Sequence, residues 1–230
     1  MSRQIPWSRV VAEGAVIVVS ILLAFAIDAW WNRVQERDDE RRALEALRGE
    51  FIANLTHLRA VHDVHGRFAH RLDQLVGRVL SEPQGRVIQV SDSVLLPLVS
   101  FRTADPAMGT LNILLASGRI GLIRSEDLQQ ALAGWPAVLE DAAEDEALIR
   151  DFIYGQLIAG LGGHMDIATL LLARGPDRLT GRQFSIVVNP TTRTLIGQRS
   201  QLAYLVVGQS QSRLETGEAI LAMIERDLSR

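Results

Sequence analysis

Cysteine and lysine are both absent from this sequence of 230 residues. Without cysteine the chain forms no disulfide and offers no thiolate for catalysis, for a zinc ribbon or for an iron–sulfur cluster. Arginine carries all of the positive side-chain charge, and the net charge is only -3. A balance so close to neutrality excludes the strongly basic surface expected of a protein that binds nucleic acid.

Catalytic motifs are also lacking. None of the serines stands in the sequence G-x-S-x-G. The segment GLGGH at 160–164 has the glycines of a phosphate-binding loop without its lysine and hydroxyl, and the acidic run EDAAEDE at 140–146 is typical of a solvated helix face. We therefore predict that the protein is not an enzyme and needs no cofactor.

Four of the five histidines cluster on one predicted helix, at His57, His62, His65 and His70. Only His62 and His65, at positions i and i+3, share a face suited to one metal ion. Two ligands do not complete a metal site, so a solvated histidine face is the favoured interpretation. His62 and His65 remain the candidate ligands.

One apolar run stands out, between Glu13 and Asp28. Its 14 residues are short for a membrane span, which needs roughly 20 residues to cross a hydrocarbon core of about 30 Å. Apolar residues on both flanks extend the run, so that a helix over 9–31 is polar only near its two ends. This pattern predicts a transmembrane anchor helix preceded by a short basic tail over 1–8.

The two ends of this predicted helix carry residues suited to a membrane interface. Trp7 and Trp30 are 23 positions apart, a helical rise of roughly 34 Å that would place one indole at each interface. The predicted interface anchors are Trp7, Arg9, Glu13, Asp28, Trp30 and Trp31. Ser20 and Ala24, four positions apart, form a small-residue face against which another membrane helix could pack.

Two other interpretations of the run stay open. Arg3, Arg9 and the small-x-small segment Ala24-Phe25-Ala26 also fit a cleaved signal peptide, although Glu13 weakens that interpretation. A buried helix of a soluble domain is the second alternative. For an anchor, we predict the inner membrane of a bacterium. The short basic tail favours a periplasmic over a cytoplasmic location for the large domain. The larger number of arginines after the predicted span, taken alone, favours the cytoplasm.

The remainder of the chain is predicted to be helical. Residues 32–43 have almost no apolar face and indicate a charged helical stalk. An amphipathic pattern then runs to the breaker Glu82-Pro83-Gln84-Gly85, with apolar residues spaced by threes and fours: Leu44, Leu47, Phe51, Leu55, Leu58, Val61, Phe68, Leu72, Leu75 and Val79.

Later helices are predicted to start at Asp105-Pro106, Ser125 and Asn189-Pro190, with a boundary at Trp135-Pro136. Residues 86–104 have no clear pattern, and the strand-like RQFSIVV at 182–188 has no evident partner. The predicted fold is all-α: a transmembrane helix continues into a long amphipathic helix, which belongs to an extrinsic antiparallel helical bundle over 44–230.

The anchor resembles that of a bacterial family of uncharacterised single-pass membrane proteins. The resemblance rests on Glu13, Val18, Leu22-Leu23-Ala24, Ile27-Asp28 and Trp30, followed by the arginine- and glutamate-rich stalk. Ser117-Gly118, Leu122-Ile123 and the leucines at 128 and 132 are similar to a second family signature, and Asn189-Pro190 fits as well. Ala26 and Asp28 depart from the frequent glutamine and asparagine, so no role of those amides carries over. The resemblance implies an anchored helical domain and supplies no catalytic residues.

These observations predict a non-enzymatic accessory subunit that docks onto a larger bacterial membrane complex, of respiratory or photosynthetic type, and stabilises it. The expected partners are the lipid bilayer and other membrane protein subunits, with no nucleic acid, and a homo-oligomer is left open. The alternative is a membrane-anchored sensor or signalling bundle that depends on a partner for its output.

Overall fold

The structure, a computed structural model, describes residues 7–172 and 179–229, with side chains from residue 18 onward. It is predominantly helical, which confirms the all-α prediction in its coarse form. The elements in chain order are α1 (Trp7–Ser81), β1 (Val87–Ser91), α2 (Asp92–Val99), α3 (Gly109–Ala116), the 3-10 helix η1 (Arg119–Leu122), α4 (Glu126–Asp151), the π-helix η2 (Phe152–Leu157), α5 (Ile158–Leu161), α6 (Ile167–Leu172), β2 (Gln183–Val187) and α7 (Pro190–Leu228).

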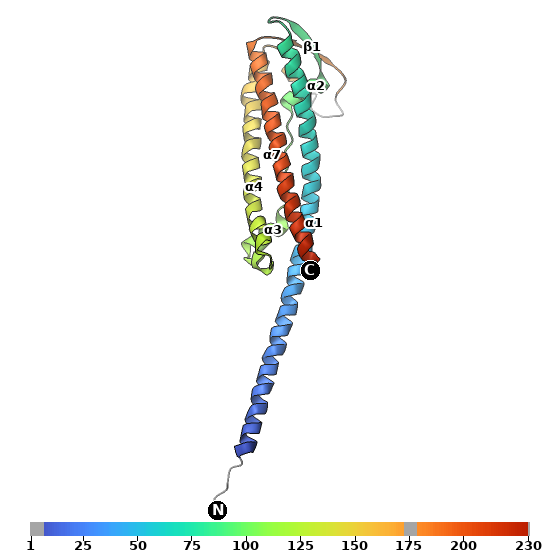
Figure 1. Ribbon diagram of the computed structural model, residues 1–230. Helices are drawn as coiled ribbons and strands as arrows, with labels where there is room; N and C mark the ends of the chain where they lie inside the picture. The colour runs from blue at the N-terminus through green and yellow to red at the C-terminus, as the bar shows by residue number, and fades with distance from the viewer. Residues whose placement is uncertain (1–6, 173–178, 230) are drawn as a thin grey trace, which may run out of the picture.

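Helix α1 is uninterrupted over 75 residues and is therefore about 112 Å long at 1.5 Å per residue. Its amino-terminal part projects from the rest of the molecule, and its carboxy-terminal part lies alongside α7 (Figure 1). The apolar positions predicted from 44 to 79 are buried, except Phe68, which is half-buried. We call these buried positions the buried stripe: Leu44, Leu47, Phe51, Leu55, Leu58, Val61, Leu72, Leu75 and Val79.

Helix α7 covers the buried stripe and runs antiparallel to α1. Arg48 pairs with Glu225 at 3.2 Å and Arg59 with Glu218 at 2.7 Å, so the later residue of α1 meets the earlier residue of α7. The predicted start at Asn189-Pro190 is confirmed by a capping box. The Asn189 side chain accepts from the Thr192 amide at 2.9 Å, and the Thr192 hydroxyl accepts from the Asn189 amide at 3.0 Å.

The predicted strand at 182–188 does have a partner, contrary to the sequence interpretation. It is β1, which pairs with β2 in antiparallel register from Val87 opposite Val187 to Ser91 opposite Gln183. Both strands bury alternate residues, because Ile88 and Val90 face the same core as Phe184 and Ile186. Since the strands are nearly 100 residues apart in the chain, no hairpin turn signals this pairing.

Helix α3 begins later than predicted, at Gly109 rather than after Asp105-Pro106. Side chains of α1 decide this start. Asn54 forms two hydrogen bonds with the backbone of Ala107, at 2.7 and 2.8 Å, and the Glu50 carboxylate accepts from the amides of Thr110 and Leu111 at 2.6 and 3.3 Å. Amides of the first turn are thus capped from another helix instead of by Asp105.

Helix α4 starts at the predicted cap, where the Ser125 hydroxyl accepts from the Leu128 amide at 3.4 Å. The boundary predicted at Trp135-Pro136 is wrong, because α4 continues through Pro136 to Asp151. Trp135 is fully buried there, with its ring 5.6 Å from that of Phe51. Packing of this large side chain outweighs the hydrogen bond that proline removes from the helix.

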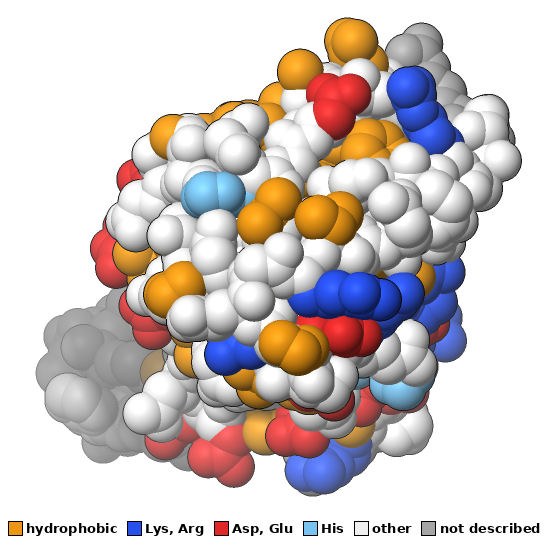
Figure 2. Space-filling model, turned by 90° about the horizontal axis from the view of Figure 1, so that it is seen from above, with side chains coloured by type: hydrophobic (Ala, Val, Ile, Leu, Met, Phe, Trp, Pro, Cys, Tyr) orange, Lys and Arg blue, Asp and Glu red, His pale blue; other side chains and the backbone are white. Residues whose placement is uncertain are grey.

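The buried apolar side chains divide mainly into two clusters. One joins the first half of the buried stripe to α3, Trp135 of α4 and the carboxy-terminal end of α7, and the other joins the second half of the stripe to α2, α6 and the two strands. Figure 2 looks onto the end farthest from the amino terminus, where hydrophobic, basic and acidic side chains are interspersed. His62 and His65 of α1, and Ser210 and Arg213 of α7, lie between the parts of these helices that contribute to the two clusters.

Candidate functional site

The first candidate site is the projecting part of α1. Every side chain from 18 to 31 is exposed, and we call this stretch the exposed apolar segment. Its large hydrophobic residues are between 50% and 67% exposed: Val18, Val19, Ile21, Leu22, Leu23, Phe25, Ile27, Trp30 and Trp31. Soluble monomers rarely expose a contiguous apolar surface of this kind, so the segment is a candidate for contact with another molecule or a lipid phase.

The predicted interface residues fall partly on this segment. Trp30 and Trp31 are exposed, and Asp28 accepts a hydrogen bond of 3.4 Å from the Asn32 amide group one turn later. Trp7, Arg9 and Glu13 belong to α1, but their side chains lie outside the described residues. Ser20 and Ala24 are both exposed. Among the described residues, no helix combines the length and the hydropathy of a membrane span.

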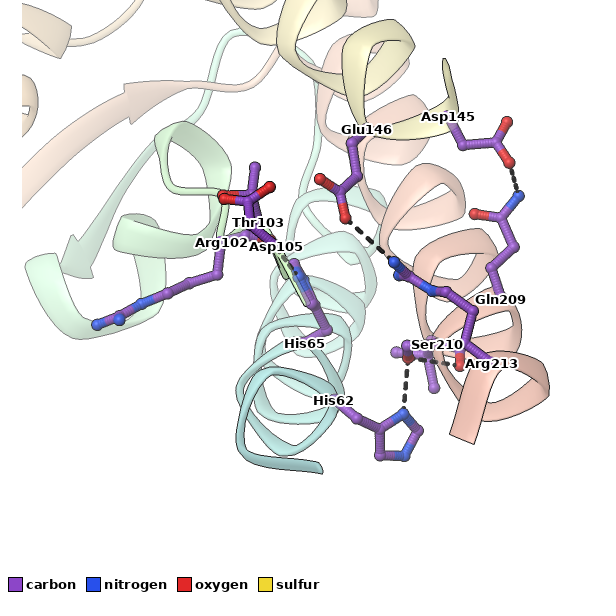
Figure 3. A network of polar contacts seen from close by, with 11 residues as sticks. His62, His65, Arg102, Thr103, Asp105, Asp145, Glu146, Gln209, Ser210 and Arg213 are labelled. Atoms are coloured by element: carbon purple, nitrogen blue, oxygen red, sulfur yellow. Dashed lines mark hydrogen bonds and ion pairs between the residues drawn. The ribbon is translucent and has the colours of Figure 1, made fainter. Parts of the chain in front are cut away.

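The second candidate is a set of polar side chains, all buried except the half-buried His62, which we call the polar layer; Figure 3 labels every member except Arg199. Its members are His62, His65, Glu146, Arg199, Ser210 and Arg213. They come from α1, α4 and α7, the long helices that lie together in Figure 1. Each is positioned by a hydrogen bond or an ion pair, as burial of a polar group requires.

His62 and Ser210 join α1 to α7. The His62 Nδ1 atom lies 2.7 Å from the Ser210 hydroxyl, which donates to the Val207 carbonyl at 2.9 Å. Because the hydroxyl proton is used in that second bond, we infer that Nδ1 of His62 is the donor to Ser210. The interaction therefore fixes both the tautomer of His62 and the register of the two helices.

His65 is the most buried histidine, at 3% exposure. Its Nε2 donates to the Arg102 carbonyl at 2.8 Å, and its ring lies 5.1 Å from that of Phe101. Burial lowers the pKa of His65 to about 4, and the nearby charges of Arg199 and Arg213 act in the same direction. His65 is consequently neutral at physiological pH and serves as a hydrogen-bond donor beside the buried stripe.

Arg213 and Glu146 form an ion pair between α7 and α4, at 3.4 Å. Both side chains are nearly inaccessible to solvent. Burial raises the pKa of Glu146, and the attraction of Arg213 opposes that rise. Beside this pair, the Gln209 amide donates to Asp145 (Figure 3). The two contacts tie α4 to α7 at the level of the polar layer.

Arg199 is the largest polar side chain in the core and is 1% exposed. It donates to the carbonyls of Leu98 and Ser100, at 3.3 and 3.0 Å, where α2 ends. Burial lowers the pKa of Arg199 to about 10, so it remains cationic at neutral pH. A cation at the carboxy-terminal end of a helix is favourably placed for the helix dipole.

The candidate metal ligands do not converge on one point. His62 binds Ser210 of α7, whereas His65 binds a carbonyl in the connection between α2 and α3. Within the described part of the chain, there is no group of three or more histidine, aspartate and glutamate residues arranged to hold a metal ion. The geometry of the two histidines instead supports helix positioning.

Sequence reasoning missed the other charged members of the polar layer, although their spacing gave a signal. Ile196, Arg199, Ala203, Val206, Ser210, Arg213, Gly217 and Ile220 follow one another by threes and fours along α7 and are all buried. Arg199 and Arg213 thus occupy positions of the apolar face. Glu146 does the same in α4, between the buried residues Ala142 and Ile149.

No family model, curated protein or solved structure matches this chain. The resemblance to the single-pass membrane family therefore stays a prediction, and the sites are interpreted from their geometry.

Proposed function

We propose that this protein is a single-pass accessory subunit that inserts α1 into a bacterial inner membrane and holds a helical bundle against a larger membrane complex. The observation that carries the proposal is the exposed apolar segment. Its large hydrophobic side chains are all at least half exposed, and this part of α1 projects away from the body of the protein (Figure 1). A hydrocarbon phase surrounds a helix and so satisfies apolar side chains in every direction.

The dimensions of α1 fit this role. A span over 9–31 has 23 residues and a length of roughly 34 Å, enough for a hydrocarbon core of about 30 Å. Trp30 and Trp31 would lie at the interface on the side of the body. Glu40, the first buried residue after the exposed apolar segment, follows Trp31 by a rise of about 14 Å. The bundle, with α7 antiparallel to α1, would therefore stand just outside the headgroups, on the periplasmic side.

Attachment to a partner would use the face of α1 that carries Ser20 and Ala24. Small residues four positions apart allow another helix to approach closely within a bilayer. Val18 and Leu22 lie on the opposite face of the same turns. The role of the small-residue face can therefore be tested directly, because Ser20 with Ala24 and Val18 with Leu22 can be substituted separately in the same helix.

The test is to solubilise the tagged full-length protein in mild detergent and measure which membrane proteins accompany it in a constant ratio. We expect a stable complex that Ser20→Leu with Ala24→Leu disrupts, while the protein stays in the membrane fraction. The matched control, Val18→Leu with Leu22→Ile, should retain the complex. A monomer or homodimer recovered from wild-type membranes would contradict the accessory-subunit proposal.

A sensor anchored to the membrane is the second candidate, favoured by the continuity of α1. The same uninterrupted helix carries the exposed apolar segment and the His62 and His65 contacts of the polar layer. A shift of α1 along α7 would have to break the hydrogen bond between His62 and Ser210. A ligand that moved the two helices would therefore send that displacement along α1 toward the exposed apolar segment. Recovery as a free homodimer would favour this candidate.

A further inference from the structure

A groove with a volume of about 660 Å³ lies beside the polar layer. Its walls come from α1, the end of α2 with the connection that follows it, the junction of α4 with the π-helix η2, and Leu179 before β2. This volume is within the range of about 300–1,000 Å³ that small-molecule sites occupy. The groove belongs to neither candidate site described above.

Four arginines line the groove: Arg67, Arg71, Arg102 and Arg150. No aspartate or glutamate is among the described residues that line it. Arg71 is held in place by a hydrogen bond of 3.0 Å to the Ser93 carbonyl, and the Arg102 side chain extends away from the polar layer in Figure 3. Within the described residues, none of the four guanidinium groups forms an ion pair. The described lining of the groove therefore carries positive side-chain charge and no acidic residue.

The remaining wall is largely apolar. Val64, Phe68, Leu96, Val99, Phe101 and Ile153 contribute hydrocarbon and aromatic surface. Leu96, Val99 and Ile153 are buried parts of the core, so this wall is rigid. A ligand that satisfied only the arginines would leave this surface in contact with water, and a purely apolar ligand would leave the arginines without an anion.

The π-helix gives an independent indication of a site. Its residues Ile153 and Tyr154 line the groove, and Arg150 lies two residues before its first residue, Phe152. π-Helices are rare and occur frequently at functional sites, because the wider turn changes where its side chains point. Here the π-helix lies where the apolar wall meets Arg150.

We propose that this groove binds a small anionic amphiphile, with its acid group held by the arginines and its hydrocarbon part on the apolar wall. A carboxylate or phosphate oxygen pair matches the fork of donors on a guanidinium group. The ligand is a free molecule rather than a lipid of the surrounding bilayer. If Trp30 lies at the interface, as proposed above, Arg67 is about 55 Å farther along α1.

Equilibrium dialysis tests this assignment on the full-length protein in phosphatidylcholine nanodiscs, with empty nanodiscs as the blank. The probe is radiolabelled octanoate, compared with octanol, octylamine and acetate. We expect octanoate to bind about tenfold more tightly than each of the other three, because only octanoate uses both the arginines and the apolar wall. Equal binding of octanoate and octanol, or of octanoate and acetate, would overturn the assignment.

Variants locate the bound probe. Arg67→Gln with Arg150→Gln should weaken octanoate binding by about tenfold. Arg78→Gln changes another exposed arginine of α1 outside the groove and should leave binding unchanged. Circular dichroism establishes that each variant is folded, and the comparison of probes on the wild-type protein stands without them. Full retention of octanoate by the double variant would place the probe elsewhere and reject the proposal.

A further measurement distinguishes a free ligand from a lipid headgroup of a bilayer as the source of the acid group. Phosphatidylglycerol vesicles added to the nanodiscs should not displace octanoate, because a headgroup in a bilayer cannot enter a groove that also requires the hydrocarbon part. Displacement by vesicles would assign the arginines to a membrane surface and overturn the proposal of a free ligand. Because these readouts do not depend on co-purifying subunits, they are independent of the accessory-subunit test.

Discussion

Two stretches of the same helix have opposite environments. In the exposed apolar segment Leu22 is 61% exposed, whereas Leu47 of the buried stripe is 0% exposed. The buried stripe places apolar residues on one face, which α7 and its neighbours cover, and leaves polar residues on the other. The exposed apolar segment is apolar on every side, so no single neighbouring helix could cover it. The comparison shows that one helix meets two different surroundings, only one of which this chain supplies.

The largest effect is expected from placing the same charge in each stretch. Leu47→Asp buries an unpaired carboxylate and removes core packing, so we expect the free energy of unfolding to fall by more than about 4 kcal/mol. Leu22→Asp should change it by less than about 0.5 kcal/mol, because the side chain packs against nothing in the body. Thermal unfolding in detergent, followed by circular dichroism, measures both.

The second readout of this pair is membrane retention. Leu22→Asp places a carboxylate near the centre of the proposed span, so the variant should leave the alkaline-washed membrane fraction while its body stays folded. Equal destabilisation by the two substitutions would show that the exposed apolar segment is buried by the body after all, and the comparison would fail.

A smaller effect is expected from acid, which acts on the buried histidine beside the stripe. The folded protein lowers the pKa of His65 to about 4 from an ordinary 6.5. The unfolded chain therefore binds the proton more readily, so this contribution to stability is present above pH 6.5 and is lost as pH falls toward 4. The loss amounts to roughly 3 kcal/mol.

Denaturant unfolding at several pH values between 4 and 7 measures how steeply the free energy of unfolding depends on pH. His65→Gln keeps a donor for the Arg102 carbonyl but cannot titrate, so stability should fall less on acidification, whereas His57→Gln changes an exposed histidine of α1 as a matched control. Glu146→Gln should make the fall steeper, because a raised carboxyl pKa favours the folded state as pH decreases. Identical slopes for wild type and His65→Gln would contradict the assignment.

The smallest effect concerns how closely α7 approaches the buried stripe. A Cβ atom on Gly217 would lie 2.9 Å from Cδ2 of Leu55 and 3.3 Å from Cη2 of Trp135, whereas one on Gly208 would meet nothing within 4 Å. Gly217→Ala should therefore destabilise the protein by about 1–3 kcal/mol. Gly208→Ala should stabilise it by up to about 1 kcal/mol, through helix propensity. Chemical denaturation compares them, and a stabilising Gly217→Ala would mean that the two helices are not packed this closely.

Local rules predicted much of the fold correctly. The spacing of apolar residues identified the buried stripe, and the caps at Ser125 and Asn189 identified the starts of α4 and α7, because both signals operate within one helix or one turn. The pairing of β1 with β2 and the start of α3 were missed. Each depends on contacts between distant parts of the chain: a strand pair separated by nearly 100 residues, and Glu50 of α1 capping Thr110.

Of the two candidate sites, one could be recognised from local sequence and the other depends on contacts between distant parts of the chain. Leu22 and its neighbours could be recognised from the sequence as a contiguous apolar surface, because hydropathy is a local property. Glu146, Arg199 and Arg213 could not be recognised as partners in a core, since the ion pair and the α2 carbonyls exist only once three helices have packed.

The sequence by itself therefore determined the long helices, their buried faces and the apolar stretch that this chain leaves uncovered. These features follow from the period of the helix and from hydropathy. Only the tertiary structure decided that Pro136 lies inside a helix, that two charged side chains of α7 are buried, and that four arginines border one apolar groove. Packing brings together residues from distant segments, and the free energy of that packing outweighs local preference.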